Sequence, residues 1–412
     1  MQHNPCETLI AAGYGVSLGG FSAVDRYLDL PPLPFTCLET DADLSVLGRL
    51  FEGLRFPGVD LADGVLDEGD HSWYFRCIET EEDYRMTPEA PAFRLLSLTQ
   101  DWQTRRFRDP QGVYPLLRRI RDRLRKGERA GAGEPGWTFP EPGAAGYRAI
   151  MEGALILARY GPEEYRRIGD VAAALQANES PPASRNRPPG SEAQRRLLTA
   201  ILVSPQPDRG MELLKAAGFI EEFWPEFSLL DEVGHSKEFH PEGNVWHHTM
   251  ETFRYRKPPG GRALSYDLRL SLGLLLHDVG KPLSASSRSR PFDGHAELGA
   301  RAARKFLERL EFPPPLIDDV CYLVKNHMIP AALPRLPLAR TAEIMASPLF
   351  PTLMELYRCD ESSSFKGLDA YYESSAAYQA YLRYRRNPYR SADGKVGGYP
   401  LAWSPGTGRH GG

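Results

Sequence analysis

The stretch Leu274-Leu275-Leu276-His277-Asp278-Val279-Gly280-Lys281-Pro282 joins an apolar run to a His-Asp pair, and a Gly-Lys-Pro breaker follows at once. A run this apolar is expected to be buried, so the pair would place two ligand-type side chains at the floor of a cleft. Neutral imidazole and carboxylate are donors for Zn, Mn, Fe, Co or Ni, and for Mg where carboxylate and water dominate. A single His-Asp pair is weak evidence, and its meaning depends on the residues around it.

Five of the ten histidines lie between positions 247 and 327. Most of them, and one further aspartate, stand at the ends of apolar runs, in the words WHHT, LLLHD, LVKNH and LYRCD. Side chains placed this way on neighbouring helices can converge inside a bundle. Any one of these histidines, taken alone, is best explained as a core or capping residue held by one hydrogen bond. The ordered set predicts a shared metal site; its members are His248, His277, Asp278, His295, His327 and Asp360.

The pattern His…His-Asp…Asp on a helical scaffold resembles the HD superfamily of metal-dependent phosphohydrolases. The flanking words FHPEGNVWHHTMET, LLLHDVGKP, RPFDGHAELGA, LERLEFP and LVKNHM are more specific. Together they resemble the HD domain attached to bacterial tRNA nucleotidyltransferases and poly(A) polymerases, over roughly residues 210–365.

This resemblance implies a divalent-metal cofactor, with two ions per chain chosen from Mn, Fe, Co, Ni or Mg. His248, His277, Asp278 and Asp360 would bind the first ion, and His295 and His327 would complete the position of a second. Asp278 is the natural bridge between the ions. Lys281 would neutralise phosphate charge during catalysis, although a solvent-exposed turn lysine is an equally good interpretation. Arg288 and Arg290 are weaker candidates for contacts to substrate phosphate.

The composition bounds the remaining possibilities. A chain of 412 residues with 42% hydrophobic and 25% charged residues has room for two or three soluble domains. A net charge of −4 does not indicate a nucleic-acid binder overall, although a local patch can still be basic. The five scattered cysteines form no Cys-x-x-Cys pair, which favours a reducing compartment. Because we find neither a signal peptide nor a membrane-spanning run, we expect a cytoplasmic protein with no membrane partner.

The order of the segments predicts an α+β protein. We expect a small α/β head at residues 1–126, a helical neck at 147–229, an all-helical HD domain at 230–386 and a flexible tail at 387–412. A Gly- and Pro-rich linker would occupy residues 127–146. In the head, residues 72–78 and 93–98 are predicted strands and residues 41–51 a helix. Later helices are predicted at 147–176, from Ser191 onward, and at 245–253, 266–277, 296–310, 315–327, 342–366 (interrupted near Pro348 and Pro351) and 371–385.

A basic stretch, YPLLRRIRDRLRKGER, follows the head strands. It gathers Arg118 and Arg119 with further arginines and Lys126. A solvated helix face is the simpler interpretation. A more specific interpretation is a surface that binds RNA phosphates, because clustered lysine and arginine supply the sequence-independent part of such binding.

The head resembles the nucleotidyltransferase fold of the same family only faintly. Gly19-Gly20 and Thr40-Asp41-Ala42 match family words, but the two catalytic aspartate positions fall on Phe35 and Cys37. Neither side chain can bind Mg²⁺, which requires oxygen ligands. Asp41 and Asp43 could replace them only from a position after the strand. The family's Asp-Pro-x-Arg word, expected near residues 146–149, is absent.

Three functions follow from these features. The first is a metal-dependent phosphohydrolase acting on nucleotides or RNA ends, such as terminal or 2′,3′-cyclic phosphates, with a head that no longer transfers nucleotides. The alternatives are a non-catalytic RNA-binding protein and a tRNA nucleotidyltransferase or poly(A) polymerase with rearranged carboxylates. The partner would be a nucleotide or RNA, with tRNA as one candidate; the sequence does not define the oligomeric state.

Overall fold

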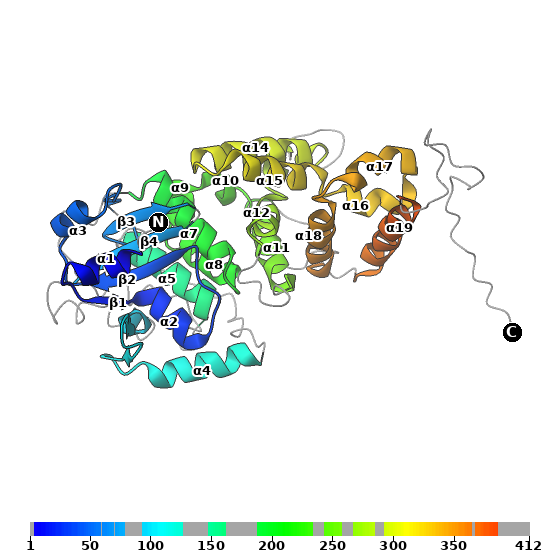
Figure 1. Ribbon diagram of the computed structural model, residues 1–412. Coiled ribbons are helices and arrows are strands. Elements are labelled where there is room, and N and C mark those ends of the chain that lie inside the picture. The colour runs from blue at the N-terminus through cyan, green and yellow to red at the C-terminus, as the bar shows by residue number, and fades with distance from the viewer. Residues whose placement is uncertain are drawn as a thin grey trace. The chain divides into compact units, whose positions relative to one another are not determined.

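The computed structural model describes residues 4–58, 60–69, 71–78, 93–126, 147–161, 188–233, 243–257, 267–284, 292–364 and 367–385 (Figure 1). The side chains of residues 338 and 339 are also outside this set. The predicted linker at 127–146, the predicted tail and the candidates Arg288 and Arg290 therefore lie outside the described residues. The described part of the chain contains no helix long and apolar enough to cross a membrane.

Two compact units make up the chain, and each is described by itself. Unit 1 comprises Met1–Leu229, Arg256–Ser271 and Lys305–Pro314, and unit 2 comprises Leu230–Tyr255, Leu272–Arg304 and Pro315–Gly412. Unit 1 contains a β-sheet with helices, whereas unit 2 is helical throughout its described residues. The α+β class predicted from the sequence is confirmed. The exact domain limits given above stay predictions.

Within the described residues, the sheet of unit 1 has six strands in the order β3-β4-β2-β1-β5-β6. The central strands β2 and β4 run parallel, with Cys37 beside Tyr74, and the remaining neighbours are antiparallel. Aromatic rings pack between these two strands, since Phe35 at the start of β2 stacks on Tyr74 of β4 with ring centroids 4.2 Å apart. The strands are β1 (Val16–Leu18), β2 (Phe35–Thr40), β3 (Gly64–Glu68), β4 (His71–Cys77), β5 (Thr99–Asp101) and β6 (Phe107–Arg108).

The predicted helix at 41–51 forms as α3 (Leu44–Leu50), because Asp43 caps it by accepting a hydrogen bond from the Val46 amide at 2.8 Å. The predicted strand at 93–98 is wrong. Its residues form the 3₁₀ helix η2 (Phe93–Ser97), closed by a hydrogen bond from the Ser97 hydroxyl to the Arg94 carbonyl. A short run that is buried on several sides, as Leu95, Leu96 and Leu98 are, fits either conformation, so periodicity could not separate them.

A buried ion pair ties the sheet region to helix α5 (Tyr147–Tyr160). The Arg159 guanidinium donates to the Asp25 carboxylate on α2 (Gly20–Leu28) at 2.6 Å, and the Tyr160 hydroxyl donates to the same oxygen at 2.9 Å. Side-chain exposure is 3% for Arg159 and 6% for Asp25. Removing one partner of such a pair would leave the other charge buried without compensation, so this contact specifies where α5 docks.

Of the other helices of unit 1, α1 was not predicted, while those after residue 111 lie in segments that the sequence predicted as helical; α5 ends at Tyr160, and residues 162–187 are outside the described set. Helix α4 begins after a turn in which the Asp109 carboxylate accepts from the amides of Val113 and Tyr114. Helix α7 begins at Ser191, as predicted, but Gly190 is its N-cap and the Ser191 hydroxyl bonds to Glu311 instead. The remaining bounds are α1 (Pro5–Ala11), α4 (Tyr114–Arg125), α7 (Ser191–Leu202), α8 (Pro207–Ala216), α9 (Phe219–Phe223) and α10 (Pro225–Ser228).

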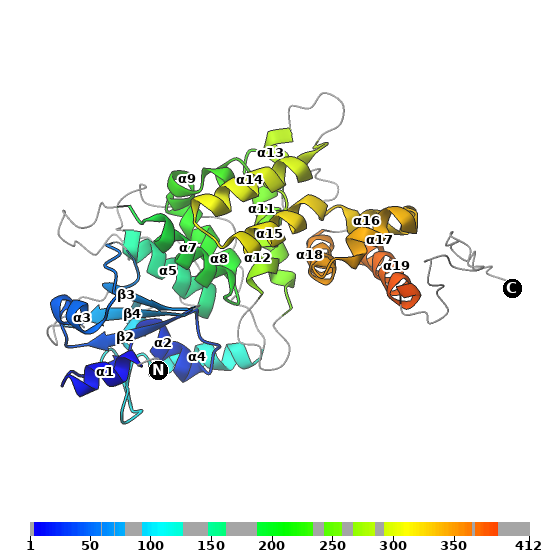
Figure 2. The ribbon, with the colours of Figure 1, turned by 45° about the horizontal axis from the view of Figure 1, so that its top comes forward.

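The helices that carry the ligands of unit 2 agree with the predicted segments to within a few residues, and the predicted interruption near Pro348 separates α17 from α18. In Figure 2, α16, α17 and α19 lie together beside α18, and these helices contact one another. The bounds are α11 (Val245–Thr252), η3 (Phe253–Tyr255), α12 (Leu268–Leu276), α13 (Lys281–Ser284), α14 (His295–Arg309), α15 (Pro314–Asn326), α16 (Ile329–Ala332), η4 (Leu333–Arg335), α17 (Leu338–Ala346), α18 (Phe350–Ser362) and α19 (Asp369–Arg385).

Candidate metal centre

Five helices of unit 2 bring the six predicted ligand side chains together. His248 lies on α11, His277 and Asp278 follow the end of α12, and His295 opens α14. His327 directly follows α15, and Asp360 lies in the last turn of α18. All are buried except Asp360, whose side chain is 23% exposed and marks the open side of the cluster. Apolar helices thus end at a common point, where their polar side chains meet.

The ligand atoms form two groups. His248, His277 and Asp360 make one group, and Asp278, His295 and His327 make the other, with the ligand atoms of each group within 4.8 Å of one another. The two carboxylate oxygens of Asp278 face different groups. Oδ2 lies 3.3 Å from Nε2 of His277 and 3.8 Å from that of His248. Oδ1 lies 3.7 Å and 3.8 Å from Nε2 of His295 and His327, so Asp278 is placed to contact both groups at once.

Three of the four histidine rings are each held by a backbone carbonyl of their own. The Nδ1 atoms of His277, His295 and His327 lie 2.7–2.8 Å from the carbonyl three residues earlier in the chain. Because a carbonyl oxygen only accepts, each Nδ1 carries the hydrogen and each neutral ring has its lone pair on Nε2. That is the tautomer a metal-binding histidine needs.

Two observations show that the donor set fits a cation. Nε2 of His277 is buried and makes no hydrogen bond to any described residue. Nε2 of His295 lies 3.1 Å from Nε2 of His327, and two acceptor nitrogens at this distance require a proton or a cation between them. Burial lowers the pKa of His327 to about 4, so this ring is neutral near pH 7 and its lone pair is available for a metal.

The carboxylates of the cluster are ionised. Burial opposes the charge of Asp278, but the neighbouring His277 and Lys281 outweigh it and hold the pKa of Asp278 well below its usual range. Burial likewise opposes the charge of Asp360, and the hydrogen bond and charge of His248 then lower its pKa below the ordinary value. The centre therefore combines anionic carboxylate oxygens with imidazole nitrogens, which is the donor chemistry predicted from the sequence.

The turn after Asp278 is closely packed. A Cβ added to Gly280 would lie 2.0 Å from the His295 carbonyl oxygen and 2.5 Å from the Gly299 amide nitrogen. Only glycine allows α14 to approach this closely. The Lys281 ammonium lies 2.6 Å from Oδ2 of Asp278, with the side chain 14% exposed. Lys281 thus contacts a predicted metal ligand directly, and its role toward substrate phosphate stays a prediction.

The sequence did not single out several groups that support these rings, above all the Ser363 hydroxyl, which lies 3.2 Å from Nδ1 of His248. The only sequence signal for Ser363 is its helical spacing of three residues from Asp360. His247, the other histidine of the WHHT word, is exposed and lies outside both ligand groups.

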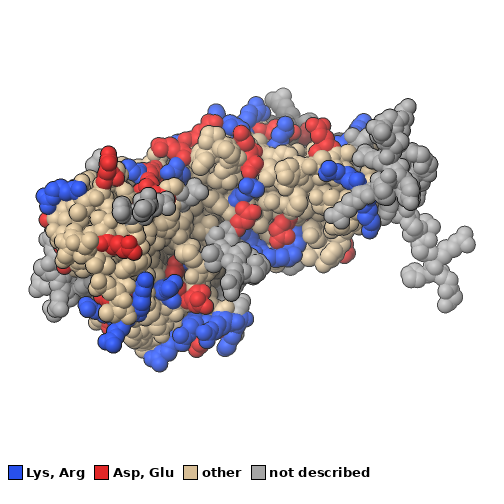
Figure 3. Space-filling view, viewed as in Figure 1, with Lys and Arg blue, Asp and Glu red and all other residues tan. Residues whose placement is uncertain are grey.

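Basic side chains gather on α4 in unit 1. Figure 3 shows lysine and arginine along the lower edge of the view, over α4. Arg118, Arg119, Arg125 and Lys126 are exposed, whereas Arg121 lies over the ring of Tyr27, 5.6 Å from its centroid. The predicted basic helix therefore forms, with its apolar residues Leu116, Leu117 and Ile120 buried on the opposite face.

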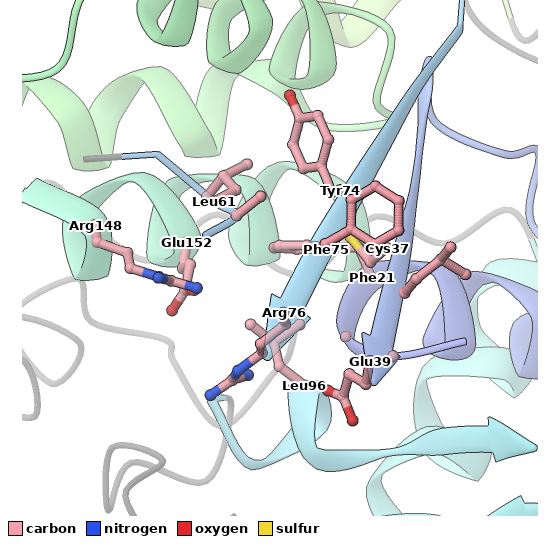
Figure 4. A pocket seen from close by; sticks show the side chains of 14 residues that line it. Phe21, Cys37, Glu39, Leu61, Tyr74, Phe75, Arg76, Leu96, Arg148 and Glu152 are labelled. Atoms are coloured by element: carbon pink, nitrogen blue, oxygen red, sulfur yellow. The ribbon is translucent and has the colours of Figure 1, made fainter. Parts of the chain in front are cut away.

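A pocket in unit 1 includes Cys37, one of the two positions at which the resemblance places the family's catalytic aspartates. The Gly19-Gly20 turn, Cys37 on β2 and Tyr74 on β4 line it (Figure 4). Burial raises the pKa of the Cys37 thiol to about 12, so it is neutral. Glu39 is buried and contributes a carboxylate to this pocket, and Arg76 on β4 lies beside it in the sheet.

The aspartates suggested as replacements for the lost carboxylates have structural roles. Asp43 caps α3. Asp41 accepts a hydrogen bond from the Gly15 amide at 2.8 Å. Neither aspartate lines the pocket around Cys37, so the structure does not support the idea that Asp41 and Asp43 replace the missing catalytic aspartates.

Comparison with known proteins agrees with the site. Residues 260–347 match the family model described as "HD domain". The matched range contains His277, Asp278, His295 and His327, and the fold adds His248 and Asp360 from outside it. The helical unit that holds the cluster thus contains a region that matches an HD domain.

Parts of the chain are also similar to curated tRNA nucleotidyltransferases. The chain is 33% identical over 181 residues to the CC-adding tRNA nucleotidyltransferase of Thermus thermophilus, covering 42% of this chain and 39% of that protein. It is 31% identical over 175 residues to the A-adding tRNA nucleotidyltransferase of Deinococcus radiodurans, covering 41% and 37%. A Multifunctional CCA protein of Halorhodospira halophila is 33% identical over 127 residues, covering 31% and 29%.

These matches span less than two-fifths of the length of each relative. Among solved structures, the CCA-adding enzyme of Bacillus stearothermophilus in complex with CTP is similar at 13% identity and a TM-score of 0.43, covering 92% of this chain and 80% of that one.

Proposed function

We propose that this protein is a metal-dependent phosphohydrolase of the HD type that acts on phosphate esters of nucleotides or RNA ends. The observation that carries the proposal is the division of Asp278, whose Oδ1 faces His295 and His327 while Oδ2 faces His248 and His277. One carboxylate shared between two sets of nitrogen and oxygen donors is the arrangement that a pair of divalent ions requires. Mn, Fe, Co, Ni and Mg are the candidate ions.

When bound, divalent metal lowers the pKa of coordinated water and polarises a phosphoryl oxygen. The residues of the chain would hold the ions and offset the charge of the substrate. His248, His277 and Asp360 would hold one ion, His295 and His327 the other, and Asp278 would contribute one oxygen to each. Lys281, which touches Asp278, would offset part of the negative charge that a phosphate ester brings into the site.

The names of the relatives support an RNA substrate and, specifically, a tRNA. They are transferases by name, however, and not hydrolases, so they favour a second function: addition of nucleotides to tRNA by the head. The pocket around Cys37 argues against that function because Phe35 and Cys37 offer no hard oxygen ligands for Mg²⁺. We therefore assign catalysis to unit 2 and an RNA-holding role to the head.

Elemental analysis of purified protein, combined with a phosphatase and phosphodiesterase substrate screen, tests the main proposal. We expect about two divalent ions per chain and release of phosphate from nucleotides, RNA ends or 2′,3′-cyclic phosphates. The chelator-treated protein serves as the matched control and should regain activity when metal is returned. Wild-type protein that takes up no metal would rule the hydrolase out.

We further propose that the exposed face of α4 contacts the phosphate backbone of RNA. The Arg118→Ala/Arg119→Ala variant should keep its fold, since both side chains are exposed and alanine favours helix. Its affinity for tRNA should fall by roughly 10-fold at moderate salt, and the slope of log K against log [salt] should shrink by roughly 1.5. Filter binding or fluorescence anisotropy across a salt series measures both.

The Arg301→Ala/Arg304→Ala variant is the control for this experiment, because it removes the same charge from exposed positions on α14. It should bind tRNA as the wild type does. An equal loss of affinity in both variants would mean that α4 contributes only to the general charge of the protein.

A further inference from the structure

His248 is held differently from the other three histidines of the cluster. The rings of His277, His295 and His327 are anchored through Nδ1 by backbone carbonyls, which no side-chain substitution can remove. The Nδ1 of His248 instead meets the hydroxyl of Ser363 at 3.2 Å. Ser363 is buried at the C-cap of α18, three residues after Asp360.

The Ser363 hydroxyl donates its hydrogen to a backbone carbonyl and not to His248. Its Oγ lies 2.6 Å from the backbone carbonyl of Asp360, to which it donates. A hydroxyl has one hydrogen, and a carbonyl can only accept it. The Ser363 oxygen therefore accepts from Nδ1–H of His248, so Nε2, which faces Oδ1 of Asp360, is the nitrogen left to bind a metal once it carries no hydrogen.

We propose that Ser363 is a positioning residue that selects the metal-binding tautomer of His248 and fixes its ring relative to Asp360. Nε2 of His248 lies 2.9 Å from Oδ1 of Asp360, and both atoms belong to the same ligand group. One hydroxyl thus links the ring of one ligand to the backbone of the other. This inference rests on the proposed function, because it presumes that the group binds metal.

The inference predicts a selective effect. Ser363 contacts the group of His248, His277 and Asp360, whereas each histidine of the other group is held by its own backbone carbonyl. Loss of the hydroxyl should therefore weaken one metal position and spare the other. Outer partners of metal-bound histidines typically contribute roughly 10- to 100-fold in metal affinity.

The test is titration of metal-free protein with Co²⁺, followed by calorimetry and by the visible absorption of bound cobalt. In Ser363→Ala, one of the two binding steps should weaken by roughly 10- to 100-fold while the other keeps its affinity. Ser363→Thr, which restores a hydroxyl, should recover the weakened step. Ser374→Ala is the matched control, because Ser374 is also buried in unit 2 but donates to the Ala370 carbonyl.

The outcomes separate this inference from the proposed function. If the wild type binds no Co²⁺, the proposed function fails. If the wild type binds two ions and Ser363→Ala binds both with unchanged affinity, only the positioning role fails. If both steps weaken equally and the melting temperature of the metal-free variant also drops below that of Ser374→Ala, Ser363 is merely structural and the inference is overturned.

Discussion

Replacing Asp278 by alanine is expected to abolish binding of both metal ions and to lower phosphate release by more than about 10²-fold. Both carboxylate oxygens of Asp278 are used, one toward each ligand group, so the substitution removes a donor from both positions at once. Elemental analysis and a phosphate-release assay on the preferred substrate measure the two effects. No other single ligand in the cluster should have consequences for both positions.

Two further variants make this result interpretable. Asp278→Asn keeps the volume of the side chain but removes its charge, which separates loss of metal from loss of packing, and circular dichroism checks the fold. Asp318→Ala removes a carboxylate that is 67% exposed on α15 and pairs with Arg304, and it should behave as the wild type. An Asp278→Ala protein that still holds two ions would show that Asp278 is not the bridge.

The wild-type protein, incubated with CTP or ATP and a tRNA that lacks its 3′ terminus, is expected to incorporate no nucleotide. In the proposed geometry of the head, Phe35 and Cys37 stand where paired aspartates would hold Mg²⁺. Phe35 is stacked on Tyr74 in the core, and burial keeps the Cys37 thiol neutral. Gel electrophoresis of radiolabelled tRNA detects incorporation with high sensitivity.

The CC-adding relative of Thermus thermophilus supplies the positive control for this assay. The Glu39→Gln variant provides an internal control, because Glu39 is the residue of β2 whose carboxylate lines the pocket. Incorporation by the wild type that Glu39→Gln eliminates would show that the head has rearranged its carboxylates. In that case the activity of this protein would be nucleotide transfer, as the relatives' names favour, and not hydrolysis.

Much of the secondary structure was accessible from the sequence. Apolar residues at helical spacing located α11, α12, α14, α15 and α19 to within a few residues, and the helix predicted at 41–51 forms as α3, with Asp43 as the cap that the structure identifies. The apolar pattern gave the wrong element at Phe93–Ser97, where a short run that is buried on several sides forms a 3₁₀ helix in place of the predicted strand. Local pattern identifies an element only when one face remains polar.

By itself, the sequence determined which residue types end the apolar helices of unit 2, and therefore that imidazoles and carboxylates would meet. Only the tertiary structure decided how they divide into two groups, that the two oxygens of Asp278 face different groups, and that Ser363 holds His248. The physical reason is that His248 and Ser363 are 115 residues apart along the chain. Their contact depends on how α11 packs against α18, a relation that no local pattern encodes.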